Sequence, residues 1–576
     1  MADIGIKTVR EIGAGSTPKL SSPIDVGIVG VGLGTVQIIT DLETKLSAGE
    51  NDIDIFITDT AEDVLKVSAN QTDYINTYTK NIDYNFTTPN KITWLNSLLQ
   101  SPELEAVYGA DGTNMDTTSV YEFKVTATGT PKTTGDAGET LGSNSITCKC
   151  TAITDSIILK WSKVQFATGY NIYLRINQTG SFLRIATIAN PNTITYKLVT
   201  TPSAGSTEIP VQATAVRKPA LNSSYYVTYS KLVYDTDIHV ISSQSEAEQL
   251  FGYGSELSNM TQLALKTYNL SQVYACAVNS SKTDVTIDKF INAIDKLSNF
   301  KIQYICALTN SESVQSYAMV HAKNMSGIEE QNERFAVRSI VNTVHDVGTE
   351  STANTILYFL KSYNNEKRLI VPIPNRNQLV MTYYNEPDGT VTENKLVPNY
   401  MIACAYMFLI ASQPDPATST IGQQLYGFTY PVSSTSSYWI DSAVCDKIAK
   451  LGGTYIKNVN GIPIVYNDNT NDTSLIENWE RSVLSGEDEL VRRIRLFFVS
   501  YLGKKITVNN KILSSIYSHV NDLLVLAKTD EIISDYDTGS LEVKQNAINK
   551  TEVDVYFKYT PAYPLKQLIF KYTFSA

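Results

Sequence analysis

The stretch IDVGIVGVGLGTVQIITDLE, residues 24–43, begins with an apolar run and continues through three closely spaced glycines. A dinucleotide-binding fingerprint needs G-x-G-x-x-G, or Ala at its last position, between a strand and a helix. Gly30 and Gly32 fit, but Thr35 stands at the third position, and the β-branched VQIITD that follows favours a strand. We therefore interpret this stretch as the first strand of an α/β core, in which the glycines allow a tight turn.

The alternative interpretation is an NAD-dependent oxidoreductase that uses the Gly30–Gly34 loop, with Asp59 at the end of IDIFITD as the ribose partner. No other motif supports an enzyme. The sequence has no P-loop and no G-x-S-x-G, and DNTNDTSLIENW, from Asp468, departs from a calcium loop at Thr473 and Trp479. We expect a polar turn there, and no catalytic, cofactor-binding or metal-binding residues.

Composition narrows the function further. The chain has 576 residues, 43% of them hydrophobic and 18% charged, with a formal net charge of -11 and four histidines. An acidic chain lacks the basic footprint that nucleic-acid binding needs. The six cysteines show no metal-ligand spacing, so buried reduced thiols are expected. The first residues do not read as a secretory signal, and the apolar run at 401–411 is too short to cross a bilayer.

Strand and helix signals alternate in residues 23–103 and again in 219–440, which predicts one mixed α/β core. Within it, KITWLNSLLQ at 91–100 and the region 398–411 are expected as helices. Residues 104–218 instead carry six short β-rich runs separated by turn signals, which predicts an inserted β-sandwich. Trp161 and Tyr170 resemble the Trp and Tyr of fibronectin type III modules, where one ring packs under the other.

A C-terminal α/β domain is expected at 441–564. SAVCDKIAKLGG is a helix with a glycine stop, and TYIKNVNGIPIVYN is a hairpin around Asn-Gly. EDELVRRIRLFFVSYLG and NKILSSIYSHVNDLLVLAK are two further helices, the second with an apolar stripe. That stripe consists of Ile512, Leu513, Ile516, Val520, Leu523 and Leu524.

Both ends of the chain have the character of arms that add a strand to another sheet. Residues 1–22 contain a weakly alternating segment followed by the linker GAGSTPKLSSP, and residues 565–576 end in an alternating strand. Strand addition needs a short extended segment whose alternation sets the register. The candidate strand-exchange residues are Ile4, Ile6, Thr8, Leu568, Phe570, Tyr572 and Phe574.

An ordered series of segments carries a family resemblance. It includes SEAEQLFGYGSELSNMTQLAL, NERFAVRSIV, KRLIVPIP, LVPNYMIACAYMF, LGGTYIKNVNGIPIVYN, WERSVLSGEDELVRRIRLFFVSYLGKKIT, KILSSIYSHVNDLL, IISDYDTGSLEVKQN and VDVYFKYTPAYPLKQLIF. In this order they resemble the tail sheath proteins of contractile-tailed bacteriophages and of related tailocins and contractile injection systems. The resemblance is strongest over 441–576, and the sandwich would be a decoration domain outside the common core.

The resemblance implies a mechanical role in the tail of a virion that is assembled in the host cytoplasm. Sheath subunits stack as hexameric rings around a tail tube and contract to drive the tube through the host envelope for genome delivery. The implied partners are further copies of the chain, the tube protein, and baseplate and terminator proteins, with no nucleic-acid contact and no membrane insertion. A surface or adhesion protein that uses the sandwich is a third interpretation.

Charge suggests which part would face the tube. Basic and acidic residues balance in 446–576, so the net negative charge arises from residues 1–445. The expected tube-facing residues of this neutral part are Arg492, Arg493, Lys504, Lys505 and Lys511. A solvated or internally paired helix face is the equally weighted alternative for these cations.

Overall fold

The computed structural model describes residues 24–45, 54–56, 61–69, 77–87, 91–203, 205–220, 223–327, 330–340, 347–363, 365–375, 379–431, 442–499, 511–549 and 552–566. The chain forms two compact units. The first, here called the body, comprises Met1–Thr35 and Tyr234–Ala576, and the second, the inserted unit, comprises Val36–Val233. The ranges proposed for one α/β core, 23–103 and 219–440, therefore each contain a boundary between units.

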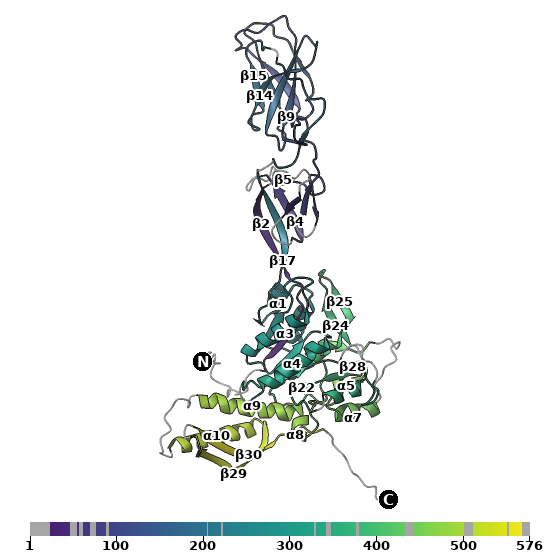
Figure 1. Cartoon of the computed structure of the whole chain (residues 1–576), viewed down its shortest axis with the longest axis vertical. Coiled ribbons are helices and arrows are strands. Elements are labelled where there is room, and N and C mark those ends of the chain that lie inside the picture. Colours follow the sequence, from purple (N-terminus) through teal and green to yellow (C-terminus); the bar gives the residue numbers. More distant parts are fainter. Residues whose placement is uncertain are drawn as a thin grey trace. The chain divides into compact units, whose positions relative to one another are not determined.

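A six-stranded sheet in the order β18-β19-β1-β20-β21-β22 is the centre of the body (Figure 1). β1 runs parallel to both of its neighbours, whereas β18 is antiparallel to β19. All five residues of β1 are buried, as a central strand covered on both faces requires. The strands are β1 (Val26–Gly30), β18 (His239–Ile241), β19 (Val273–Ala277), β20 (Tyr304–Ala307), β21 (Phe335–Val337) and β22 (Leu369–Ile370).

Helices cover both faces of this sheet. Successive strand residues point to opposite faces, so the apolar strands present side chains on both faces that must be buried. Ile28 belongs to one apolar core and Val29 to the other. The first core contains α1 (Gln244–Phe251), α2 (Glu256–Gln262), the π-helical turn η2 (Leu263–Thr267) and α6 (Asn399–Ala411). The second contains α3 (Ile287–Lys296), which continues into the 3-10 turn η3 (Leu297–Asn299), α4 (Glu312–Met325), α5 (Ile356–Ser362) and α7 (Ser442–Lys450). Every residue of α6 is buried, which confirms the buried helix expected there.

Smaller elements surround the central sheet. β23 (Pro372–Pro374), β27 (Thr454–Val459) and β28 (Ile462–Val465) form one three-stranded sheet. β24 (Val380–Asn385), β25 (Val391–Leu396) and β26 (Phe428–Thr429) form another. Asn460 and Gly461 join β27 to β28 with φ values of 54° and 86°, which confirms the Asn-Gly hairpin.

The glycine-rich loop does not provide a dinucleotide site. The Asn279 side chain closes it: Asn279 Oδ1 accepts from the Gly32 amide at 2.8 Å, and Asn279 Nδ2 donates to the Gly32 carbonyl at 2.9 Å. The chain then continues as the strand β2 (Thr35–Lys45), which confirms the expected strand. A pyrophosphate needs the amino terminus of a helix after the glycines, so the geometry does not support the NAD-dependent alternative.

The described residues of the inserted unit form four main sheets and the two-stranded pair β10-β16. One sheet, β2-β17-β4-β5, joins β2 to β17 (Ser224–Val233), β4 (Asp63–Ser68) and β5 (Thr77–Tyr78), and another, β3-β7-β6, contains β3 (Asp54–Phe56), β7 (Lys91–Trp94) and β6 (Tyr84–Thr87). The helix expected at 91–100 is wrong, because Lys91–Trp94 pairs with two strands. The Trp94 ring lies 4.7 Å from that of Tyr78, in an aromatic cluster that suits a strand.

The remaining two sheets lie within the range predicted for a sandwich. Their orders are β11-β9-β13-β14 and β15-β12-β8. Trp161 packs against Tyr170 with ring centroids 5.3 Å apart, so this contact is present, while kinship with fibronectin type III modules stays a prediction. The strands are β8 (Leu104–Gly109), β9 (Tyr121–Thr128), β10 (Thr130–Pro131), β11 (Ile146–Cys148), β12 (Ser156–Trp161), β13 (Gly169–Ile176), β14 (Leu183–Ile188), β15 (Thr195–Leu198) and β16 (Ala215–Val216).

A substitution in the glycine loop tests its packing. Gly34 has a φ of +76°, and a Cβ there would lie 2.9 Å from the Tyr234 ring. We expect Gly34→Ala to lower the free energy of unfolding by more than the ~1–2 kcal/mol of a left-handed alanine alone. Gly389→Ala is the control, since Gly389 has a φ of +90° and open space around it. Equal shifts of the urea midpoint for the two variants would contradict this packing.

A buried histidine predicts a pH dependence of stability. His321 on α4 lies 3.0 Å from Arg334 Nη1, and burial together with this cation lowers the His321 pKa to about 4, although Asp295 opposes the shift. The folded-state pKa of His321 lies below its unfolded value of ~6.5. The stability that the protein gains from burying neutral His321 is therefore fully present above pH ~6.5 and is lost as the pH falls toward 4. The free energy of unfolding, measured by urea unfolding at a series of pH values, should fall by about 3 kcal/mol less in His321→Gln than in the unsubstituted protein as the pH is lowered through this range. An unchanged slope would refute it.

Candidate functional site in the helix–hairpin module

Two long helices and a β-hairpin form a module at the C-terminal side of the body, here called the helix–hairpin module (Figure 1). It comprises α9 (Arg481–Phe498), α10 (Lys511–Thr529), β29 (Ile533–Gln545) and β30 (Val553–Pro561). α9 begins earlier than the predicted helix, just after the short helix α8 (Ile476–Trp479). The module has its own apolar core, and its buried members are Leu490, Ile516, Val520, Leu524, Ala527, Ile532, Ile533 and Leu541. This list includes much of the stripe predicted for α10.

Among the described residues, the hairpin is a sheet of two strands, in the order β29-β30. Its inner face packs on the helices through partly buried side chains that include Val555 and Phe557, while Tyr556 is 52% exposed. Within the part of the chain that the structure describes, neither outer edge pairs with a third strand. Two free edges of this kind are templates for strand addition.

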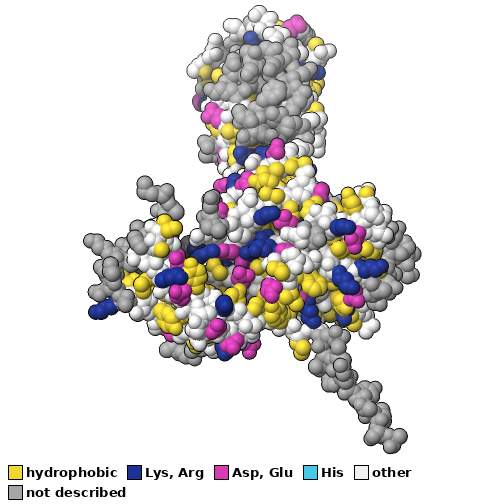
Figure 2. All heavy atoms as spheres, turned by 60° about the horizontal axis from the view of Figure 1, so that its bottom comes forward, with side chains coloured by type: hydrophobic (Ala, Val, Ile, Leu, Met, Phe, Trp, Pro, Cys, Tyr) yellow, Lys and Arg dark blue, Asp and Glu magenta, His cyan; other side chains and the backbone are white. Residues whose placement is uncertain are grey.

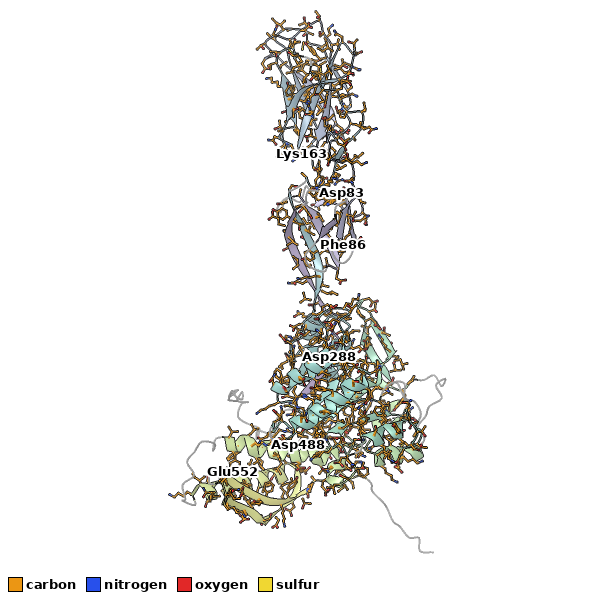
Figure 3. All side chains as sticks on the ribbon, in the orientation of Figure 1. Asp83, Phe86, Lys163, Asp288, Asp488 and Glu552 are labelled. Carbon is orange, nitrogen blue, oxygen red and sulfur yellow. The ribbon has the colours of Figure 1, made fainter. Side chains whose placement is uncertain are left out.

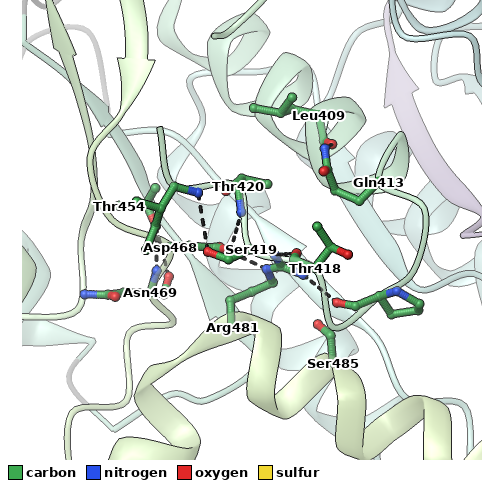
Figure 4. Close-up of polar contacts among 12 residues, drawn as sticks. Leu409, Gln413, Thr418, Ser419, Thr420, Thr454, Asp468, Asn469, Arg481 and Ser485 are labelled. Atoms are coloured by element: carbon green, nitrogen blue, oxygen red, sulfur yellow. Dashed lines mark hydrogen bonds and ion pairs between the residues drawn. The ribbon is translucent and has the colours of Figure 1, made fainter. Parts of the chain in front are cut away.

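A fully buried ion pair connects the start of α9 to the rest of the body (Figure 4). Arg481 Nη2 lies 2.5 Å from Asp468 Oδ2, and Arg481 Nε donates to Asp468 Oδ1 at 2.9 Å. The Tyr406 hydroxyl and the Thr420 amide also donate to Asp468, at 2.8 and 3.0 Å. The remaining Arg481 donors reach the carbonyls of Pro416 and Thr418 at 2.8 and 2.6 Å. Both charges are therefore satisfied, as their burial requires.

The loop around Asp468 is buried along residues 467–472, in contrast to the polar turn expected from the sequence. Its side chains bind backbone groups of neighbouring elements. Asn467 donates to the Gly453 carbonyl at 2.7 Å, Asn469 to that of Ala449 at 3.2 Å, and Asn471 to that of Leu451 at 3.0 Å. At the positions that a calcium loop from Asp468 would use, Asp468 pairs with Arg481, and Thr470 Oγ1 donates to the Asn478 carbonyl at 2.5 Å. No metal-binding cluster occurs among the described residues. We call this loop and Arg481 the polar hub.

Further ion pairs attach α9 to the body along its length. Arg368 Nη2 donates to Asp488 Oδ1 at 2.9 Å, and both side chains are buried. Figure 3 shows Asp488 on the α9 helix, while Glu552 lies at the far end of the hairpin. Nearer the end of α9, Arg495 pairs with Glu333 at 2.5 Å. The helix is therefore held at three points by arginine–carboxylate contacts.

The electrostatics of the polar hub follow from this geometry. Burial alone would raise the pKa of Asp468, but the charge of Arg481 and the hydrogen bonds from Arg481, Thr420 and Tyr406 outweigh it and hold the pKa below its ordinary value. The Tyr406 pKa is raised well above its usual range, by burial and by the charge of Asp468. Tyr406 therefore remains a neutral donor at physiological pH.

The structure separates the cations predicted to face a tube. Arg493 is buried, and its guanidinium binds Glu489 at 2.9 Å and Asp530 at 2.6 Å, so it serves the interior of the module. Arg492 pairs with Glu489 and is 18% exposed, whereas Lys511 is exposed at the start of α10. Lys504 and Lys505 lie outside the described residues. On the face drawn in Figure 2, Lys and Arg side chains alternate with Asp and Glu rather than forming a field of one sign.

The predicted strand-exchange residues all lie outside the described residues: Ile4, Ile6, Thr8, Leu568, Phe570, Tyr572 and Phe574. Sequence reasoning missed the polar hub altogether. Only the density of Asn, Asp and Thr in NDNTND marked it, and that composition is equally typical of an exposed turn. No helix among the described residues is long and apolar enough to cross a bilayer.

The polar hub predicts a large stability effect. Asp468→Asn removes the counter-charge of a fully buried guanidinium, so we expect a loss of about 3–5 kcal/mol in the free energy of unfolding. Adding Arg481→Met should restore a large part of it, because the uncompensated charge is then absent. Asp535→Asn, at an exposed pair with Lys528, is the control and should leave the urea midpoint nearly unchanged. A double variant no more stable than the single one would contradict this account.

No family model and no curated protein matches this chain. A sheath tail protein from Desulfitobacterium hafniense has 10% identity and a TM-score of 0.38, with 96% of this chain and 100% of that chain covered. A sheath tail protein from Listeria innocua has 9% identity and a TM-score of 0.39, with 94% and 93% covered. The helical sheath of the anti-feeding prophage in the contracted state has 12% identity and a TM-score of 0.43, with 59% and 88% covered. The solved structures that resemble this chain thus include sheath proteins, the family that its sequence segments resemble.

Proposed function

We propose that this chain is the subunit of a contractile tail sheath. Copies of it form hexameric rings that stack as a helix around a tail tube, and the stack contracts to drive the tube through a host envelope for genome delivery. The proposal rests on the ordered sequence segments and, in the structure, on the β29–β30 hairpin, whose two edges pair with no third strand among the described residues. The subunit acts through assembly rather than catalysis.

The hairpin edges and the terminal segments complement each other in this proposal. A hairpin of two strands gains stability when further strands complete its sheet. The alternating segments at residues 3–10 and 566–574 supply such strands from neighbouring copies, and the linker GAGSTPKLSSP gives the first of them reach. A head-to-tail contact of this kind produces an open helical stack rather than a closed pair.

The helix α9 attaches the hairpin firmly to the core around the central sheet, which suits the transmission of force. α9 contributes Leu484 to the core around the central sheet and Leu490 to the core of the helix–hairpin module. The buried pairs of Arg481 and Arg368 hold the first half of this helix to the body. A load on a neighbour's strand therefore reaches the central sheet through one helix.

Tube contact is assigned to the outer side of the module. Lys511, together with Lys504 and Lys505, is proposed to contact acidic side chains of the tube protein. Arg492 and Arg493 are left out because Glu489 already pairs with both of them, and Asp530 also pairs with Arg493. The remaining partners are baseplate and terminator proteins, and the acidic net charge of -11 argues against contact with nucleic acid.

Truncation of the arms tests the proposed assembly. Purified full-length protein should form long tubular polymers in negative-stain microscopy. Deletion of residues 567–576, which keeps the Lys566–Glu480 ion pair, should abolish the polymers while the subunit still unfolds cooperatively. Phe570→Pro should act like the deletion, because proline removes a backbone donor and cannot continue a strand ladder. Phe570→Ala is the matched control and should retain polymers, although fewer of them.

Two outcomes would oppose the proposal. Polymers that persist in the deletion variant and in Phe570→Pro would refute assembly by strand exchange. A full-length protein that stays monomeric, and whose melting temperature rises with NAD or NADP, would favour the oxidoreductase instead.

A further inference from the structure

A hollow of 470 Å³ lies at the amino ends of β1 and β19. Its walls are Ile24, the segment 267–272, the segment 411–416 and Tyr426. All of these belong to the body, and none is part of the helix–hairpin module. The volume lies within the range of a ligand or peptide site, ~300–1,000 Å³.

The lining of the hollow includes one acidic side chain, Asp415, and the aromatic rings of Tyr268 and Tyr426. Asp415 is one of its wall residues, and Gln272, another, donates from Nε2 to Asp25 Oδ1 at 3.0 Å. Among the described residues that line it, none is Lys, Arg or His. Tyr426 is 49% exposed and can offer its ring to an apolar group. A carboxylate together with an exposed aromatic ring suits a peptide segment that carries one cation and some apolar surface.

The segment of this chain directly before Ile24 is such a peptide, and its connection to Ile24 places it next to the hollow. Ile24 lines the hollow, and the seven residues before it, 17–23, read TPKLSSP. Prolines 18 and 23 favour an extended polyproline conformation, in which little entropy is lost on docking. Lys19 stands five residues before Ile24 and so can reach about 17 Å from it.

We propose that residues 17–23 dock in this hollow of their own subunit, with the Lys19 ammonium beside Asp415. The wall they meet is part of the polar hub's surroundings, because Arg481 donates to the carbonyls of Pro416 and Thr418. Docking of residues 17–23 would thereby fix the direction in which the preceding N-terminal arm leaves the body. That direction is fixed relative to α9, the helix that connects to the β29–β30 hairpin. This inference does not depend on polymer formation.

Disulfide trapping in the unassembled subunit tests the docking. The six native cysteines are all buried, so engineered pairs react without competition. The test pair is Ser21→Cys with Ser271→Cys, on the hollow side of β1, and the matched control pair is Ser21→Cys with Lys301→Cys, on the β20 side. Gly27 is in register with Tyr274 of β19, and Val26 with Tyr304 of β20, so both partners lie within similar reach of Ile24. The test pair should close at least about fivefold faster, since docking raises its effective concentration.

Charge provides a second readout. Lys19→Glu, added to the test pair, should slow disulfide closure toward the control rate, whereas Lys7→Glu, in the arm outside residues 17–23, should leave it unchanged. Salt at 1 M should slow the test pair as well, because it screens an ion pair at the rim. Equal rates for the test and control pairs would overturn the proposal, as would cross-linked dimers, which would make the occupant a second copy's linker. Neither outcome would affect the polymer test.

Discussion

The ion pair between Asp468 and Arg481 is the contact on which the rest of the body depends. Taking two charges out of water costs several kcal/mol per ion, so the pair is stable only if further hydrogen bonds satisfy it. Tyr406 of α6 and the segment 416–420 supply those bonds, and the neighbouring asparagines tie the same loop to α7 and β27. One buried loop thus determines how a fully buried helix, a small sheet and the start of α9 meet.

From that starting point α9 extends from the apolar core around the central sheet into the core of the helix–hairpin module. With 18 residues it is about 27 Å long, which lets its two halves belong to separate apolar cores. Its first half is held by buried arginine–carboxylate pairs, whose directional geometry limits rotation of the helix more than apolar packing alone does. The orientation of the β29–β30 hairpin is therefore set by charges that lie in the interior of the body.

Local signals predicted the elements that depend on local physics. The apolar run of β1, the Asn-Gly turn between β27 and β28, and the stripe of α10 all agree with the structure. The apolar residues of KITW at 91–94 suit either a helix or a strand period, so the helix prediction there is wrong, and only pairing with β3 and β6 decides for a strand. The polar hub was not predictable, since Asp468 meets Tyr406 and Thr420 only through tertiary contacts 62 and 48 residues away. The alternation at residues 3–10 and 566–574 predicts extended arms, and strand exchange through them stays a prediction, because almost all of these residues lie outside the described part of the chain.

The contrast between satisfied charges and unsatisfied edges indicates what can hold copies together. The arginines described on α9 are engaged within the subunit: Arg481 and Arg493 are buried, Arg492 pairs with Glu489, and Arg495 pairs with Glu333. Breaking such pairs to form new ones with a neighbour would leave buried carboxylates uncompensated, which is costly. Among the described residues, the main chain at the hairpin edges pairs with no third strand, and the exposed Tyr556 belongs to the same hairpin. Main-chain hydrogen bonds tolerate changes of side-chain environment, so in the proposed sheath contacts made through them would persist while the copies rotate against each other.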